Sequence, residues 1–128
     1  MLYDLLIVTN LPYLAAALFA LTKEQYIFCI LLLIVFFAST AYHSNHHEAW
    51  MGLLDRCCAV FTCLVIGSIA VARSHHVPLS MGIISGVVAL CMFWDAQDGG
   101  YSNPDYCVTH SMWHILTAFT SIMFMASY

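Results

Sequence analysis

Five continuous apolar runs, separated by short polar segments, dominate the pattern of hydrophobic and polar positions along the chain. They cover residues 5–21, 26–42, 57–72, 77–94 and 106–128, so each has 16 to 23 residues. At a rise of about 1.5 Å per residue, a helix of that length can cross the roughly 30 Å core of a bilayer. The runs do not alternate in polarity, which favours helices over the strands of a membrane barrel. We therefore predict an all-α integral membrane protein, with residues 1–128 forming a single transmembrane domain of about five helices.

Composition agrees with this prediction. Hydrophobic residues make up 62% of the chain and charged residues only 8%, whereas a soluble domain carries about 25% charged residues. With three Lys and Arg residues in all, the chain has no basic face for nucleic acid. A multi-pass membrane protein is the class that remains.

The first run is expected to be a retained helix and not a cleaved signal peptide. It lacks a basic segment in front of it, carries Asp4 there, and contains Asn10 and Pro12. The longest polar segment, residues 95–105, is predicted to be a loop with turn residues Gly99, Gly100 and Pro104.

An odd number of spans fixes which segments share an end of the bundle. The N-terminus and the segments around 44–55 and 95–105 fall at one end, and the segments around 22–25 and 73–76 fall at the other. The first end holds most of the acidic residues and Arg56, and the second holds Lys23, Glu24 and Arg73. By the positive-inside rule the second end is cytoplasmic, and the acidic end faces the outside or a lumen. The sequence does not say which membrane.

Six cysteines leave the redox state open. Cys29, Cys63 and Cys91 lie inside apolar runs, where cysteine behaves as a small hydrophobic residue. A disulfide between Cys107 and either Cys57 or Cys58 is possible.

Ionisable residues inside membrane helices are costly and are usually functional. Ser39 and His43 close the second run, Asp55 precedes the third, and His110 and His114 open the fifth. Residues four apart share a helix face. The predicted topology puts all of these residues at one end, so the three histidines are expected to meet.

Three imidazoles at one depth predict a metal site. Zinc bound by three nitrogens keeps a fourth position for water or substrate, which is the catalytic pattern, and it lowers the pKa of that water to about 7. Asp55 could bind the water or act as general base. Ser39 could orient the water or stabilise a developing oxyanion.

Other interpretations of these residues stay open. Asp55 could only cap the N-terminus of the third helix, and Ser39 could serve helix packing. Cys57 and Cys58 could ligate metal in a closed structural site. His43 and His114 could instead bind haem. Four further histidines are expected to be interfacial, namely His46, His47, His75 and His76. Either His46 or His47 could instead replace His43 as the third ligand.

The motif residues resemble the CREST superfamily of membrane hydrolases, which includes alkaline ceramidases, adiponectin and progestin receptors, and the branch of myomaker and GPI-processing phospholipases. Residues 36–43 (FFASTAYH) and 109–116 (THSMWHIL), with 9–11 (TNL), are similar to that last branch. The resemblance implies zinc on His43, His110 and His114, with Ser39 and Asp55 beside the metal water. It also implies hydrolysis of an amide or ester bond in a membrane lipid.

The chain departs from this family in size. The family has a seven-helix core, and five runs leave two helices missing between the third and fifth runs. The wall of the lipid cavity would then come from neighbouring chains, in a homo-oligomer or a larger membrane assembly, or the cavity would lie open to lipid. A glycine pair, Gly82 and Gly86, allows close helix approach, either within the chain or to a second chain.

Two functions follow as the main hypotheses. The first is a zinc-dependent hydrolase of a membrane lipid. The second is a non-catalytic, myomaker-like lipid-binding, membrane-remodelling or accessory protein in which zinc joins the second and fifth helices as a structural ion. A receptor-like or transport role is a third hypothesis.

Overall fold

The computed structural model describes residues 2–45, 49–73, 76–95 and 104–127. All regular structure in these segments is helical, which confirms the all-α prediction. The helices are α1 (Leu2–Val8), α2 (Leu11–Thr22), α3 (Tyr26–Ser44), α4 (Ala49–Arg73), α5 (His76–Asp95) and α6 (Pro104–Ala126). His46, His47, His75 and most of the predicted loop at 95–105 lie outside the described residues, as does the side chain of His76.

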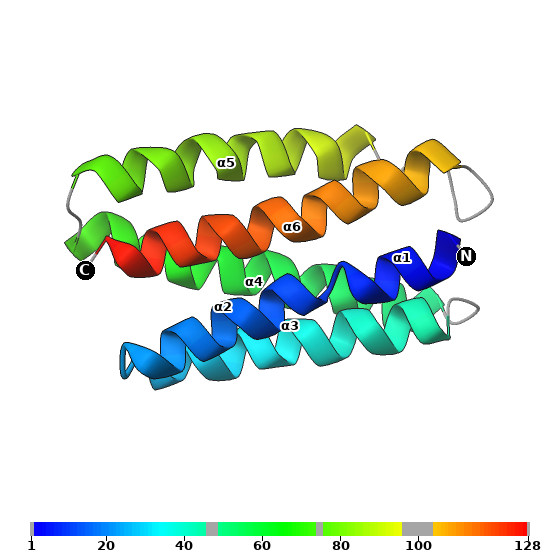
Figure 1. Cartoon of the computed structure of the whole chain (residues 1–128), viewed down its shortest axis with the longest axis horizontal. Helices are drawn as coiled ribbons and strands as arrows, with labels where there is room; N and C mark the ends of the chain where they lie inside the picture. Colours follow the sequence, from blue (N-terminus) through cyan, green and yellow to red (C-terminus); the bar gives the residue numbers. More distant parts are fainter. Residues whose placement is uncertain (1, 46–48, 74–75, 96–103, 128) are drawn as a thin grey trace.

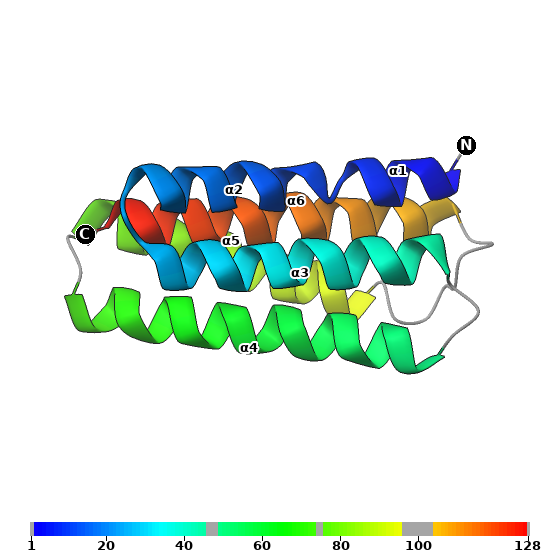
Figure 2. The same ribbon diagram turned by 90° about the horizontal axis from the view of Figure 1, so that it is seen from below.

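The helices form an elongated bundle in which α1 and α2 follow one another along a single line (Figure 1). Figures 1 and 2 show the start of α1 at the same end as the end of α3, the start of α4, the end of α5 and the start of α6. The predicted sorting of segments between the two ends is therefore confirmed. We call the end with the start of α1 the N-terminal end of the bundle.

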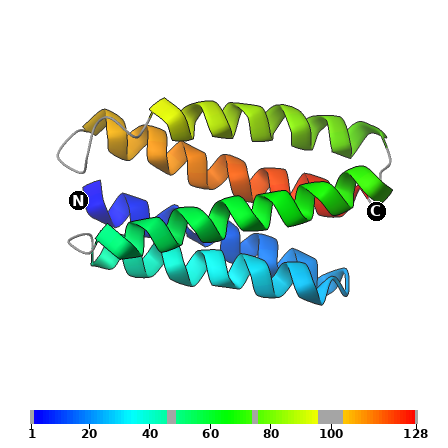
Figure 3. The same cartoon turned by 180° about the vertical axis from the view of Figure 1, so that it is seen from behind.

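Helix α6 occupies the centre of this bundle. It packs against α1, α2, α4 and α5, while α3 packs against α1, α2 and α4. The view from behind shows α5 lying along α6 on the side away from α3 (Figure 3). Since α5 packs chiefly on α6, α6 connects α5 to the rest of the bundle.

The first apolar run is one predicted helix but two observed ones. Pro12 lies in the first turn of α2 and has no N–H to donate to a carbonyl of the preceding turn, so the α-helical ladder is interrupted. The chain instead makes tighter bonds there, from Asn10 N to Ile7 O (3.2 Å) and from Tyr13 N to Asn10 O (2.9 Å). The interruption leaves Thr9 and Asn10 buried in the bundle.

The third predicted helix begins earlier than expected, at Ala49 and not at Cys57. Asp55 and Arg56 lowered the apolarity of this segment without ending the helix. The Arg56 side chain is accommodated in this helix, because its Nε donates a hydrogen bond to the carbonyl oxygen of Gly52 one turn earlier (3.0 Å).

The glycine pair of α5 packs against α6 of the same chain. A Cβ on Gly82 would lie 2.5 Å from ring atoms of Phe124, and one on Gly86 would lie 3.4 Å from Thr120 Cγ2. Between them, Ser85 Oγ lies 2.8 Å from Thr120 Oγ1. The intrachain interpretation of this motif is confirmed, so the motif gives no support to association with a second chain.

Three stretches within the described residues are helical, long and apolar enough to cross a membrane: Leu5–Thr22, Tyr26–Ser44 and Trp50–Ala72. A shorter apolar stretch covers Pro78–Met92 in α5. None of the six cysteines forms a disulfide, and Cys57 is exposed while Cys107 is buried, so the possible disulfide from Cys107 is not formed.

Candidate metal centre

The first predicted ligand, His43, lies in the last turn of α3. Helix α3 is a run of apolar residues whose buried face recurs at Leu32, Val35, Ser39 and His43, the spacing of one helix face. That periodicity turns His43 and Ser39 into the bundle, and both are at most 2% exposed.

The other two predicted ligands come from the early turns of α6. His110 and His114 are one turn apart, and they are 3% and 0% exposed. Helix α6 begins at Pro104, a residue suited to the first turn of a helix. Both imidazoles therefore point into the centre of the bundle near its N-terminal end.

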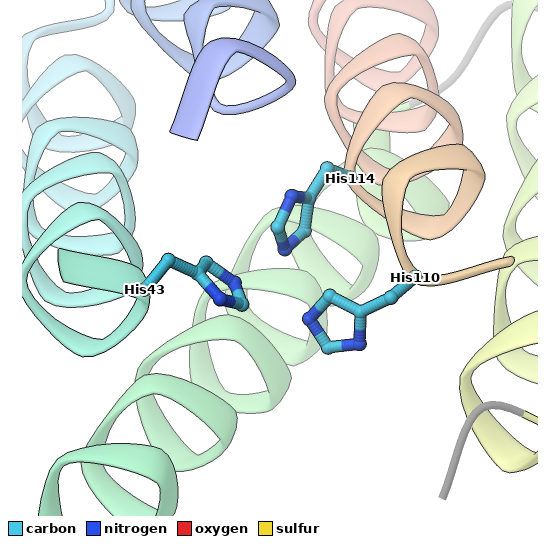
Figure 4. A group of neighbouring side chains, drawn as sticks. All are labelled: His43, His110 and His114. Atoms are coloured by element: carbon cyan, nitrogen blue, oxygen red, sulfur yellow. The ribbon is translucent and has the colours of Figure 1, made fainter. Parts of the chain in front are cut away.

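The three imidazoles converge on one point (Figure 4). Their ring centroids are 5.1 Å apart for His43 and His110, 5.1 Å for His43 and His114, and 4.7 Å for His110 and His114. One nitrogen from each ring lies within 4.8 Å of the other two. The predicted meeting of these residues is confirmed, and together they form a group that could bind a metal ion.

The donor set fits a tetrahedral metal. Zinc–nitrogen bonds of about 2.0–2.1 Å place two nitrogen ligands about 3.4 Å apart, so small side-chain rotations would draw the three rings onto one ion. His110 supports this fit, because it is buried and neither ring nitrogen has a hydrogen-bond partner among the described residues. Buried polar atoms without partners are costly and call for a ligand or another explanation.

Asp55 lies more than one turn inside α4, where it is 1% exposed. Capping of the helix N-terminus is therefore not its role, and that alternative is wrong. Ser39 and Arg56 are among the side chains that interact with its carboxyl group, while within the described part of the chain neither carboxyl oxygen has a partner in good hydrogen-bond geometry. A buried carboxyl group without hydrogen bonds is expensive to keep.

Ser39 links Asp55 to the histidines. Its hydroxyl oxygen lies 3.5 Å from Nε2 of His114, and the same hydroxyl interacts with Asp55. The serine one turn from His43 thus interacts both with the Asp55 carboxyl group and with the imidazole of His114.

The structure adds one contact that sequence reasoning missed. The Thr9 hydroxyl oxygen lies 3.3 Å from Nδ1 of His114, the ring nitrogen on the far side from Ser39. Thr9 belonged to a motif noted in the first run, but no sequence pattern could pair it with a histidine 105 positions away.

Aromatic rings close the cluster on several sides. Tyr106 stacks on His110 at 5.1 Å, and Trp113 lies 5.1 Å from His110 and 5.2 Å from His114. Tyr13 lies 5.9 Å from His114. With these rings around them the three histidines are at most 3% exposed, and electrostatic interactions are stronger in such surroundings than in bulk water.

The alternative ligand sets receive less support. The group of potential ligands found among the described residues contains only the three histidines, so Cys57 and Cys58 are not part of it. A porphyrin between His43 and His114 would need the space that the His110 ring occupies, 5.1 and 4.7 Å from those two rings. The geometry therefore disfavours haem.

Comparison with protein-family models, with curated proteins and with solved structures finds no match to this chain. The resemblance to the CREST superfamily accordingly stays a prediction that depends on the motif residues.

Proposed function

We propose that the chain is a zinc-dependent hydrolase of a membrane lipid, with its active site at the histidine cluster. The single observation that carries the proposal is that the Ser39 hydroxyl links the buried Asp55 carboxyl group to a cluster of three convergent imidazoles. Three histidines alone could bind either a structural or a catalytic metal ion. A general base must lie within hydrogen-bond reach of the attacking water, and a buried carboxyl group linked to the imidazoles through Ser39 is a candidate for that role.

A membrane location is supported by the outward faces of the helices. Large apolar side chains on four different helices are more than half exposed, and they include Leu18 (56%), Phe37 (63%), Leu64 (64%) and Ile84 (65%). A soluble monomer rarely exposes so much apolar surface. We propose that all five apolar runs span the bilayer, with the N-terminal end on the extracytoplasmic or lumenal side.

Zinc is the metal that we propose for His43, His110 and His114. Imidazole nitrogens suit zinc, and a site with three protein ligands leaves one position open, as in catalytic zinc sites. A zinc ion supplies Lewis-acid polarisation of carbonyl oxygens and makes hydroxide available near neutral pH.

The residues of the chain would divide the remaining work. Asp55 would accept a proton from the attacking water and later deliver it to the leaving amine or alcohol. Ser39, in contact with both Asp55 and His114, would orient that water by hydrogen bonding. The rings of Tyr106 and Trp113 would keep bulk water away from the reaction.

An apolar groove supports a lipid as the substrate. Helices α4 and α5 both pack on α6 but make little contact with each other. They leave between them a groove of about 260 Å³ with Trp113 in its lining. The Trp113 ring also contacts His110 and His114, so this residue borders both the groove and the cluster. We propose that an alkyl chain of the substrate lies in this groove.

A non-catalytic, accessory role is the second candidate, and one observation favours it. Each of the three histidines is at most 3% exposed, which suits an ion that joins α3 to α6 for stability alone. Such an ion needs its three ligands but has no need of Asp55.

The Asp55→Asn variant tests the proposal, with Glu24→Gln, an exposed carboxylate at the other end, as the control. Zinc content is measured in detergent-purified protein, and hydrolysis is measured on amide- and ester-linked lipids in vesicles. We expect about one zinc per chain in all three proteins, and a loss of turnover in Asp55→Asn of about 10²–10⁴-fold. Wild-type protein that binds zinc but does not hydrolyse any of the lipids would favour the accessory role. Folded wild-type protein without metal would overturn both the hydrolase proposal and the accessory role.

A further inference from the structure

Thr9 occupies the interruption between α1 and α2, and its hydroxyl group is aimed at the candidate metal centre. The residue is 8% exposed, and its Oγ1 lies 3.3 Å from Nδ1 of His114. Because Pro12 interrupts the helical ladder here, the side chain is held at a fixed point against α6.

The direction of this hydrogen bond follows from a second contact. Thr9 Oγ1 also lies 3.2 Å from the carbonyl oxygen of Leu6, and a carbonyl oxygen can only accept. A hydroxyl group has a single hydrogen to donate. Since that hydrogen is used on Leu6 O, the hydroxyl oxygen must accept from His114, and Nδ1 of His114 must carry the hydrogen.

The contact on the other side of the same ring is compatible with this arrangement. A neutral imidazole with hydrogen on Nδ1 carries its free lone pair on Nε2. That Nε2 lies 3.5 Å from Ser39 Oγ, which is able to donate to it. Figure 4 shows the two ring nitrogens of His114, one of them directed toward the space shared with His43 and His110.

We infer that Thr9 is a positioning residue, which holds His114 in the Nδ1–H tautomer and presents Nε2 as the metal ligand. This inference rests on the proposed metal site. A partner on the second nitrogen fixes the tautomer and ring orientation of a histidine ligand. His110 differs, because neither of its nitrogens has a hydrogen-bond partner in the described segments. His114 is therefore a ligand that the fold orients before metal binds, in contrast to His110.

The test compares Thr9→Val, which keeps the shape of the side chain, with Thr9→Ser, which keeps the hydroxyl group. Thr22→Val is the matched control: the Thr22 hydroxyl also bonds to the carbonyl three residues earlier, Phe19 O at 2.7 Å, but it is exposed at the end of α2. The first readout is the ¹⁵N NMR spectrum of His114 in metal-free protein. The second is the dissociation constant for zinc.

In the wild type and in Thr22→Val we expect the Nδ1–H tautomer of His114. In Thr9→Val we expect a mixture of tautomers and zinc binding that is weaker by about 10- to 100-fold. Thr9→Ser should restore both readouts.

Two results would overturn the inference. One is the Nε2–H tautomer in metal-free wild-type protein, a result that needs no metal and does not depend on how Thr9→Val folds. The other is zinc binding by folded Thr9→Val within about twofold of the wild type. If the wild type binds no zinc but His114 is the Nδ1–H tautomer, the proposed function fails and the role of Thr9 in orienting the ring stands.

Discussion

The two halves of α6 carry buried polar side chains in very different states. In the half nearer the C-terminus, Thr117, Thr120 and Ser121 each donate to a carbonyl oxygen of the same helix four residues earlier, at 2.8, 2.7 and 2.9 Å. In the half that begins at Pro104, His110 and Ser111 are equally buried, and their side chains have no hydrogen-bond partner among the residues that the structure describes. We call these the hydroxyl half and the histidine half.

This difference in hydrogen bonding distinguishes polar groups that help the helices to pack from polar groups that could bind a ligand. A hydroxyl group that bonds to its own backbone costs little in an apolar surrounding and lets neighbouring helices approach. Burial of an imidazole without hydrogen-bond partners destabilises the fold, because the ring loses its hydrogen bonds to water and gains none in return. The hydroxyl half thus accounts for how α5 is held, and the histidine half indicates where an ion would be bound.

The largest expected effect comes from removing the polar groups of the histidine half. In His110→Ala/His114→Ala we expect zinc content to fall from about one per chain to background, because a single imidazole at His43 cannot hold the ion. The control is Ser121→Ala in the hydroxyl half, which should keep its zinc. Elemental analysis of the purified proteins measures both. Equal zinc in the double variant and the wild type would show that the histidine half is not a metal site.

A smaller effect is expected where the hydroxyl half packs against the glycines of α5. In Gly82→Ala the new Cβ would lie 2.5 Å from Phe124 ring atoms. Overpacking costs about 1–3 kcal/mol, and alanine regains about 1 kcal/mol of helix propensity. We expect a net loss of about 1 kcal/mol in the free energy of unfolding, measured by denaturation in detergent.

Gly86→Ala is the matched control, since its Cβ would lie 3.4 Å from Thr120 Cγ2, close to an ordinary contact. Here the propensity gain should dominate, and stability should be unchanged or higher by up to about 1 kcal/mol. If Gly82→Ala were as stable as Gly86→Ala, close packing between α5 and α6 would not be what the hydroxyl half provides.

The smallest effect concerns the hydrogen bond between Ser85 and Thr120 (2.8 Å). Interhelical hydrogen bonds in membrane proteins contribute about 0.6 kcal/mol on average. A double-mutant cycle with Ser85→Ala and Thr120→Val should therefore give a coupling energy of about that size. A coupling energy near zero would fit packing alone, but one well above about 2 kcal/mol would contradict the view that hydroxyl groups here only assist packing.

The sequence predicted the convergence of the histidines because two simple rules sufficed. Spacing by four put His110 and His114 on one face, and the odd number of apolar runs put the end of α3 and the start of α6 at the same end of the bundle. Both rules depend only on counting along the chain. The contacts in the structure agree with them.

Three features were not predicted from the sequence: the start of α4, the interruption between α1 and α2, and the contact of Thr9 with His114. Each depends on structural details that the hydropathy pattern does not show. Apolarity alone could not show that the helix of Asp55 begins at Ala49, because charged residues reduce hydropathy without breaking a helix. Pro12 was visible, yet the length of the first run favoured a single helix. The contact of Thr9 with His114 depends on the resulting interruption, so it could not be found before the backbone was known.

The spacing of the ligands along the chain also sets when a metal centre could form during biosynthesis. His43 and His114 are separated by 71 positions, the difference between their residue numbers. At a translation rate of about 5–20 residues per second, His114 leaves the ribosome roughly 4–14 s after His43. Through that interval α3 and α4 would exist with Asp55 and one imidazole but without the rest of the site. An ion that needs all three imidazoles could therefore be held only after α6 has been made and has packed against α3.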